Sequence, residues 1–123
     1  MPRITISWPA GTITAVLRET PTASRLLDAL PISARANVWG DEVYFPVPFT
    51  ADTESDAATV VDKGAVCFWL AGDSLALLFG PTPVSEGDEC RLISAANIVG
   101  MMEGDLRHLR SVRNGDLMTV DKV

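Results

Sequence analysis

Residues 65–79 read AVCFWLAGDSLALLF, and this stretch decides the class of fold. Two apolar runs, Ala65–Leu70 and Leu75–Phe79, flank the dipeptide Gly72-Asp73, which is a frequent turn of β-hairpins. Neither run alternates polar with apolar side chains, so we expect both faces of each strand to be covered. We therefore predict a buried hairpin that has a core on one face and a helix, a loop or a partner on the other.

Short extended runs lie on both sides of this hairpin, separated by turns rich in the nine Gly and eight Pro. These further runs are Arg3–Trp8, Thr12–Leu17, Ala34–Trp39, Glu42–Val47, Ala58–Val61, Asn97–Met102 and Asp116–Val120. Gly11 lies in the first connection, at a place where we expect a positive φ angle. Thr50–Asp56 is polar and is predicted to be a loop. Eight or nine strands with little helix favour a closed barrel, because closure removes exposed strand edges.

Two segments are predicted to be helical. Thr20 is a good N-cap, Pro21 is tolerated in the first turn, and Pro31 ends the helix. Between them, one apolar stripe with helical spacing is formed by Ala23, Leu26, Leu27 and Leu30. Asp105 is expected to cap a second, short helix. The fold class that we predict is mostly β, with two short helices.

Composition limits the organisation and the partners of the chain. A chain of 123 residues with 47% apolar residues is expected to form a single domain, residues 1–123, with its own core. A net charge of −6 argues against nucleic acid as a partner. No apolar run is long enough to span a membrane, and the first residues lack the apolar segment of a secretory signal, so we expect a cytoplasmic location.

The cysteines and the single histidine give no metal-ligand spacing. Cys67 lies in the apolar hairpin, and Cys90 follows a charged turn. Reduced structural thiols are the favoured interpretation, and a disulfide between the two stays open. We predict neither a metal site nor a cofactor.

Two further segments carry a resemblance to a known family. They are WGDEVYF at residues 39–45 and FGPTP at residues 79–83, with Lys63-Gly64 between them and AANIVG at residues 95–100. In this order they resemble the small single-domain cyclophilin-like family of bacteria and archaea, over nearly the whole chain. The resemblance implies an eight-stranded barrel closed by helices, in agreement with the strand pattern. It implies little chemistry, because the family is largely uncharacterised.

Cyclophilins isomerise X–Pro bonds with an arginine that hydrogen-bonds the prolyl nitrogen, across a barrier of about 18–20 kcal/mol. Their active-site pattern, an Arg followed shortly by Phe and a Met-Gln-Gly-Gly run, is absent from this sequence. We therefore predict a binding module for a small ligand or a peptide, without the standard catalytic arginine. Two alternatives stay open: a prolyl isomerase with a non-standard site, and a non-catalytic interaction subunit or homo-oligomer.

The predicted ligand-binding residues lie in the two signature segments: Trp39, Glu42, Tyr44, Phe45, Phe79, Pro81, Thr82 and Pro83. Glu42 and Tyr44 share one face of a strand, where a carboxylate acceptor and a phenol donor suit a polar pocket wall. The alternative for Glu42 is a carboxylate satisfied by backbone N–H groups of the turn. Thr82 either points at a ligand or belongs to a loop that ends the strand.

Two other groups of residues have a functional and a structural interpretation. One group is aromatic and forms either a pocket or plain core: Trp39, Phe45, Trp69 and Phe79. The other is the basic cluster Arg107, His108, Arg110 and Arg113, which either binds an anion or forms a solvated helix face.

Overall fold

The computed structural model describes all 123 residues. Ten strands make up nearly half of the chain: β1 (Arg3–Trp8), β2 (Gly11–Leu17), β3 (Ile32–Arg35), β4 (Asn37–Val38), β5 (Glu42–Pro46), β6 (Ala58–Val61), β7 (Ala65–Trp69), β8 (Ser74–Leu78), β9 (Cys90–Glu103) and β10 (Leu117–Lys122). The helices are α1 (Pro21–Ala29) and two 3₁₀ helices, η1 (Leu70–Gly72) and η2 (Leu106–Ser111). The predicted fold class, mostly β with little helix, is confirmed.

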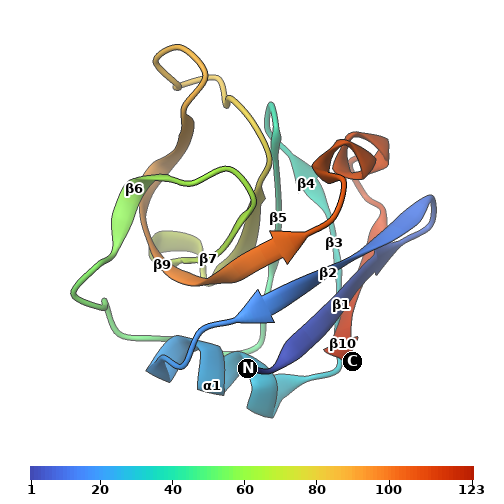
Figure 1. Cartoon of the computed structure of the whole chain (residues 1–123), viewed down its shortest axis with the longest axis vertical. Helices are drawn as coiled ribbons and strands as arrows, with labels where there is room; N and C mark the ends of the chain where they lie inside the picture. Colours follow the sequence, from blue (N-terminus) through green and yellow to red (C-terminus); the bar gives the residue numbers. More distant parts are fainter.

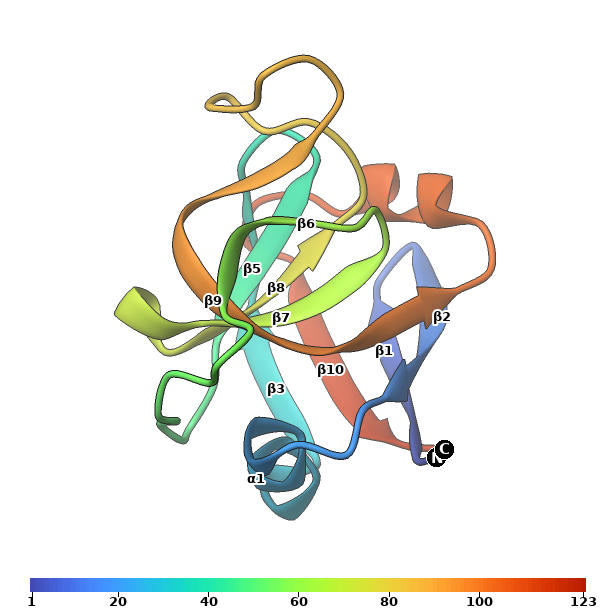
Figure 2. The ribbon, with the colours of Figure 1, turned by 60° about the vertical axis from the view of Figure 1, so that its left-hand side comes forward.

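The strands form one antiparallel sheet in the order β3-β10-β1-β2-β9-β7-β8-β5-β4, and β6 pairs with β9. The sheet curls around a central core, with α1 at one end of the molecule and η2 toward the other (Figures 1 and 2). The two termini lie side by side, because β1 pairs with β10.

A closed barrel of eight strands is not confirmed. The sheet has ten strands, and no ladder of hydrogen bonds joins its end strands, β3 and β4. These two strands are consecutive in the chain and are separated by Ala36. The N–H of Ala36 donates to the carbonyl of Asp116, and its own carbonyl accepts from Gly115, both at 2.8 Å. Ala36 is thus hydrogen-bonded to the residues just before β10. The next strand in the chain, β4, pairs with β5 instead.

The hairpin of β7 and β8 is covered on both faces, as predicted. Val66 and Phe68 point into the main core, which also contains Leu75 and Leu77 from β8. The opposite face belongs to a second apolar cluster, formed by Val61, Ala65, Cys67, Ala76, Leu78, Cys90, Leu92 and Ala96. This second face is therefore covered by β6 and the first half of β9 of the same chain. Both cysteines lie here as buried free thiols.

The helix predicted after Thr20 is confirmed. The Thr20 hydroxyl accepts a hydrogen bond from the N–H of Ala23 at 3.2 Å, which is a regular N-cap. Ala23 and Leu26 are buried against the core, as the apolar stripe predicts. Asp105 caps η2 in the same way, through the N–H of Arg107.

Two predicted turns have a different geometry. Gly11 has no positive φ angle; it begins β2 and faces Trp8, whose ring would lie 3.0 Å from a Cβ at this position. Gly11 is therefore suited to this place by close packing. The turn at Gly72-Asp73 is longer than a two-residue hairpin loop, because η1 precedes Asp73, which adopts φ 45°.

A buried amide joins three distant segments. Asn97 on β9 is fully buried, and its Oδ1 accepts from the N–H of Glu54 at 2.9 Å. Its Nδ2 donates to the Thr22 hydroxyl at 2.9 Å and to the carbonyl of Asp52 at 2.8 Å. The predicted loop at residues 50–56 is thereby held against α1 and β9.

We expect Asn97→Leu to lower the free energy of unfolding by about 3 kcal/mol, because three polar groups lose their buried partner. Urea denaturation measures this change. Asn37→Leu is the control, since the exposed Asn37 amide makes a single hydrogen bond of 3.4 Å. The control should cost less than about 1 kcal/mol. Equal costs for the two substitutions would show that the Asn97 network adds no stability.

No helix in the structure combines the length and the apolar character that crossing a membrane requires.

Candidate functional site

Strand β5 divides its side chains between two environments. Val43 and Phe45 are fully buried in the main core. Glu42 and Tyr44 point to the opposite face, so the predicted parity is confirmed. Phe45 therefore lies away from the other predicted ligand-binding residues of this segment, because adjacent residues of a strand face opposite ways.

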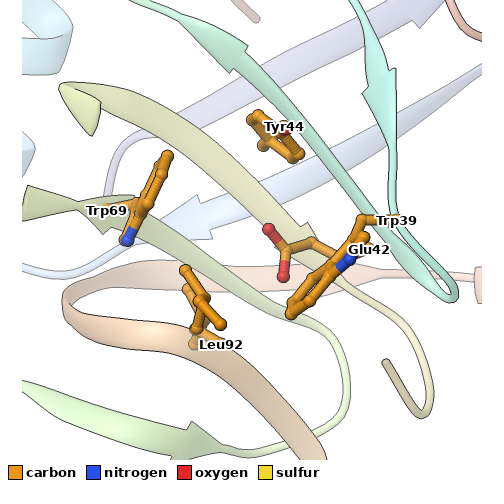
Figure 3. Close-up of a pocket in the computed structure, with 6 residues that line it drawn as sticks. Trp39, Glu42, Tyr44, Trp69 and Leu92 are labelled. Atoms are coloured by element: carbon orange, nitrogen blue, oxygen red, sulfur yellow. The ribbon is translucent and has the colours of Figure 1, made fainter. Parts of the chain in front are cut away.

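A pocket of about 230 Å³ lies on the outer face of the sheet. Its lining consists of Trp39, Glu42, Tyr44, Trp69, Leu92 and Ile93. The side chains come from the turn before β5, from β5 itself, from the end of β7 and from the start of β9. Figure 3 shows the Glu42 carboxyl group pointing into the space between Trp69, Leu92 and Trp39.

The aromatic walls of the pocket are positioned by contacts with one another and with β9. The rings of Tyr44 and Trp69 meet edge to face, with centroids 5.8 Å apart and an interplanar angle of 71°. The indole N–H of Trp69 donates to the Ser94 hydroxyl at 2.7 Å, which fixes the ring orientation. Ile93 is 59% exposed, so the pocket is open to solvent beside it.

Glu42 is the polar group of this pocket. The side chain is nearly buried, since Glu42 as a whole is only 5% exposed. Its buried Oε1 receives no hydrogen bond. The alternative of a carboxylate satisfied by backbone N–H groups is therefore wrong: the 39–42 turn is closed by backbone groups alone. Removal from water disfavours the charged form and raises the pKa of Glu42 from 4.5 to about 7.

The groups behind Glu42 do not provide a positive charge. No Lys, Arg or His lines the pocket. Burial, followed by the nearby charge of Glu42, raises the pKa of the Cys67 thiol to about 12. Burial also raises the pKa of Cys90. The Glu42 Oε1 therefore has no hydrogen-bond donor, and the pocket lining provides no counter-ion for its carboxylate form.

The two signature segments lie side by side. The N–H of Asp41 donates to the carbonyl of Pro81 at 2.9 Å, and the N–H of Phe79 donates to the carbonyl of Asp41 at 3.0 Å. Gly40, at φ 61°, packs so closely against this loop that a Cβ would lie 3.0 Å from the carbonyl oxygen of Pro81. The two signature segments therefore pack directly against each other.

The second signature does not line the aromatic pocket. The Thr82 hydroxyl is buried and donates to the carbonyl of Arg91 at 2.5 Å, so it ties the loop to β9. Pro81 and Pro83 are exposed beside Gly40. These contacts fit the alternative in which Thr82 belongs to a loop that ends the strand.

Phe79 lies at a different cavity, of about 310 Å³, together with Lys63, Arg107 and Arg110. Phe79 is also part of the main core. Asp105 lines this cavity too and holds the guanidinium of Arg107 through hydrogen bonds of 2.8–3.2 Å. Two members of the basic cluster, Arg107 and Arg110, therefore line a cavity at η2 that is separate from the aromatic pocket.

The sequence pattern does not reveal the whole pocket. It groups Trp69 with the aromatic residues without assigning it to the site, and it predicts no strand where Leu92 and Ile93 lie. These two residues belong to β9, which begins at Cys90. The signal for this strand is the return of apolar residues directly after the charged turn at residues 87–89.

The chain belongs to the cyclophilin-like family, whose model matches residues 2–121. A similar solved structure is that of the hypothetical protein AF2241 from Archaeoglobus fulgidus, with 33% identity and a TM-score of 0.84. The match covers 99% of this chain and 95% of the archaeal protein.

A second similar structure is that of McbB in complex with tryptophan, with 18% identity and a TM-score of 0.67. It covers 96% of this chain and 44% of McbB, and it shows likeness of fold alone. A search of curated proteins finds no significant match.

Proposed function

We propose that this chain is a single-domain binding module, and that a small ligand or one side chain of a peptide occupies the pocket beside Glu42. The observation that carries the proposal is the buried Oε1 of Glu42, which no protein group hydrogen-bonds. An unpaired buried acceptor costs about 1–3 kcal/mol. A ligand that donates a hydrogen bond to this oxygen offsets that cost.

The shape and lining of the pocket support a small occupant. Its volume of about 230 Å³ lies below the roughly 300–1,000 Å³ of pockets that enclose drug-sized ligands. The lining is mainly apolar and aromatic with one polar group, which is the usual composition of a site for an organic molecule. McbB, which shares this fold over 44% of its chain, has been solved in complex with tryptophan.

The two alternative functions have weaker support. Prolyl isomerisation by the cyclophilin mechanism needs a donor beside the prolyl nitrogen, and none of the eight arginines lines the pocket. The argument for an interaction subunit or a homo-oligomer is that two strands are apolar on both faces. In the structure, β6 and β9 cover the second face, so that observation requires no partner.

Binding of small organic fragments, followed by NMR, tests the proposal. We expect fragments that donate a hydrogen bond to shift the signals of Trp39, Tyr44 and Trp69. Trp69→Phe should weaken their binding by about tenfold, which corresponds to about 1.4 kcal/mol of lost aromatic contact.

The matched control is Trp8→Phe. The indole of Trp8 donates to the Ser111 hydroxyl at 2.8 Å, as that of Trp69 donates to Ser94, but Trp8 lies in the main core. We expect Trp8→Phe to leave fragment affinity unchanged. Shifts confined to the cavity at η2, or equal losses in both variants, would refute the proposed site.

A further inference from the structure

We propose that the group bound by Glu42 is a protonated amine with at least one N–H, held by the carboxylate and the surrounding aromatic rings. This inference rests on the proposed function and names the chemical class of its ligand. It follows from three features of the pocket: a carboxylate without a counter-ion, aromatic walls, and a small volume.

The first feature is electrostatic. Glu42 is 5% exposed, its Oε1 has no donor, and no basic side chain lines the pocket. Arg91 directly precedes Leu92 and Ile93, the two pocket residues of β9, but it is already paired with Glu89. A buried carboxyl group without a partner resists ionisation, and its charged form is stabilised by a positive charge that also donates a hydrogen bond. An ammonium group provides both, whereas a hydroxyl group provides only the hydrogen bond.

The second feature is the set of rings around the carboxylate. Trp39, Tyr44 and Trp69 line the same pocket, and Figure 3 shows them on different sides of the Glu42 carboxyl group. The faces of Trp and Tyr rings attract cations, and sites for ammonium groups use such rings repeatedly. The net charge of −6 adds a long-range attraction for cations.

The third feature is size. A pocket of about 230 Å³ accommodates an amine head group with a short apolar body. Such a group occurs in a free small amine and at the end of a lysine side chain. The chemistry is the same in both, so the experiment compares the two sources directly.

The test is a set of binding titrations at about pH 8, where Glu42 is ionised and alkylamines are protonated. The first pair of probes is benzylamine and benzyl alcohol, which match in shape and differ in charge. Methylamine and methanol form a smaller pair, and an end-blocked Gly-Lys-Gly peptide presents the amine on a side chain. For the wild type we expect an amine to bind at least about tenfold more tightly than its alcohol.

The variant Glu42→Gln keeps the size of the side chain and removes its charge. We expect it to bring the affinity of the amine down to that of the alcohol. Glu103→Gln is the control for net charge, because Glu103 lies at the far end of β9 in a surface pair with Arg3. This control should retain at least half of the selectivity for the amine. Urea denaturation of both variants establishes that they fold.

The outcomes separate this inference from the proposed function. If the alcohols bind the wild type as tightly as the amines, the pocket binds small organic molecules without selecting charge, and the inference fails alone. Equal loss of selectivity in the two Glu variants would assign it to net charge and would also overturn the inference. If the amines, the alcohols, the peptide and the fragments all fail to bind at millimolar concentrations, both proposals fail. Tight binding of the peptide but not of the free amines would support the inference and identify a lysine side chain as the source.

Discussion

Glu42→Gln is expected to stabilise the protein relative to the wild type by on the order of 3 kcal/mol more at about pH 8 than at about pH 4. Burial raises the pKa of Glu42 from 4.5 to about 7 on folding. Below pH 4.5 the carboxyl group is protonated in both states and contributes nothing. Between 4.5 and 7 the unfolded chain loses the proton first, so the stability of the wild type falls as pH rises. Above about 7 the loss is complete.

The surroundings of Glu42 make this pH range informative. The thiols of Cys67 and Cys90 lie in the apolar cluster behind it, and burial raises the pKa of both. These thiols therefore stay protonated up to about pH 8. The difference in the free energy of unfolding between wild type and variant therefore changes with pH because Glu42 ionises.

Urea denaturation at several pH values measures this difference. Glu103→Gln removes an exposed carboxylate and should show a difference of less than about 1 kcal/mol across the same range. A difference between Glu42→Gln and wild type that stays constant with pH would mean that the Glu42 carboxyl group is well solvated. That result would contradict the buried geometry on which the proposed site depends.

Gly100→Ala is expected to lower the free energy of unfolding by about 3 kcal/mol or more. Gly100 lies in β9 between two neighbours, opposite Leu17 of β2 and Val66 of β7. A Cβ at this position would lie 2.3 Å from the carbonyl oxygen of Val16. This oxygen belongs to the backbone of a paired strand, so it cannot move aside without disturbing the ladder.

Thermal or urea unfolding of Gly100→Ala checks this expectation, with Gly87→Ala as the matched control. Gly87 has φ 67°, and a Cβ at this position would meet no atom within 4 Å, so only the backbone conformation opposes alanine. The control should cost about 1 kcal/mol. A cost for Gly100→Ala no greater than that of the control would show that β2 and β9 are less tightly packed than the structure indicates.

The sequence alone determined those parts of the fold that depend on neighbouring residues. Thr20 and Pro21 set the start of α1, because capping involves residues within one turn. The unbroken apolar character of β7 and β8 predicted that both faces are covered, and the alternation in β5 placed Glu42 and Tyr44 on one face. Strand periodicity is a local property, so these predictions needed no knowledge of distant contacts.

Only the tertiary structure decided which residues share the pocket and what Glu42 contacts. Trp69 and Leu92 are 23 residues apart and meet Glu42 because β5, β8, β7 and β9 pair in a particular register. In the same arrangement, Phe45 and Phe79 lie in the core, and the Thr82 hydroxyl donates a hydrogen bond to the backbone of β9. Hydrogen bonding and desolvation depend on atoms that distant strands bring together, whereas the strand pattern fixes only which way each side chain faces.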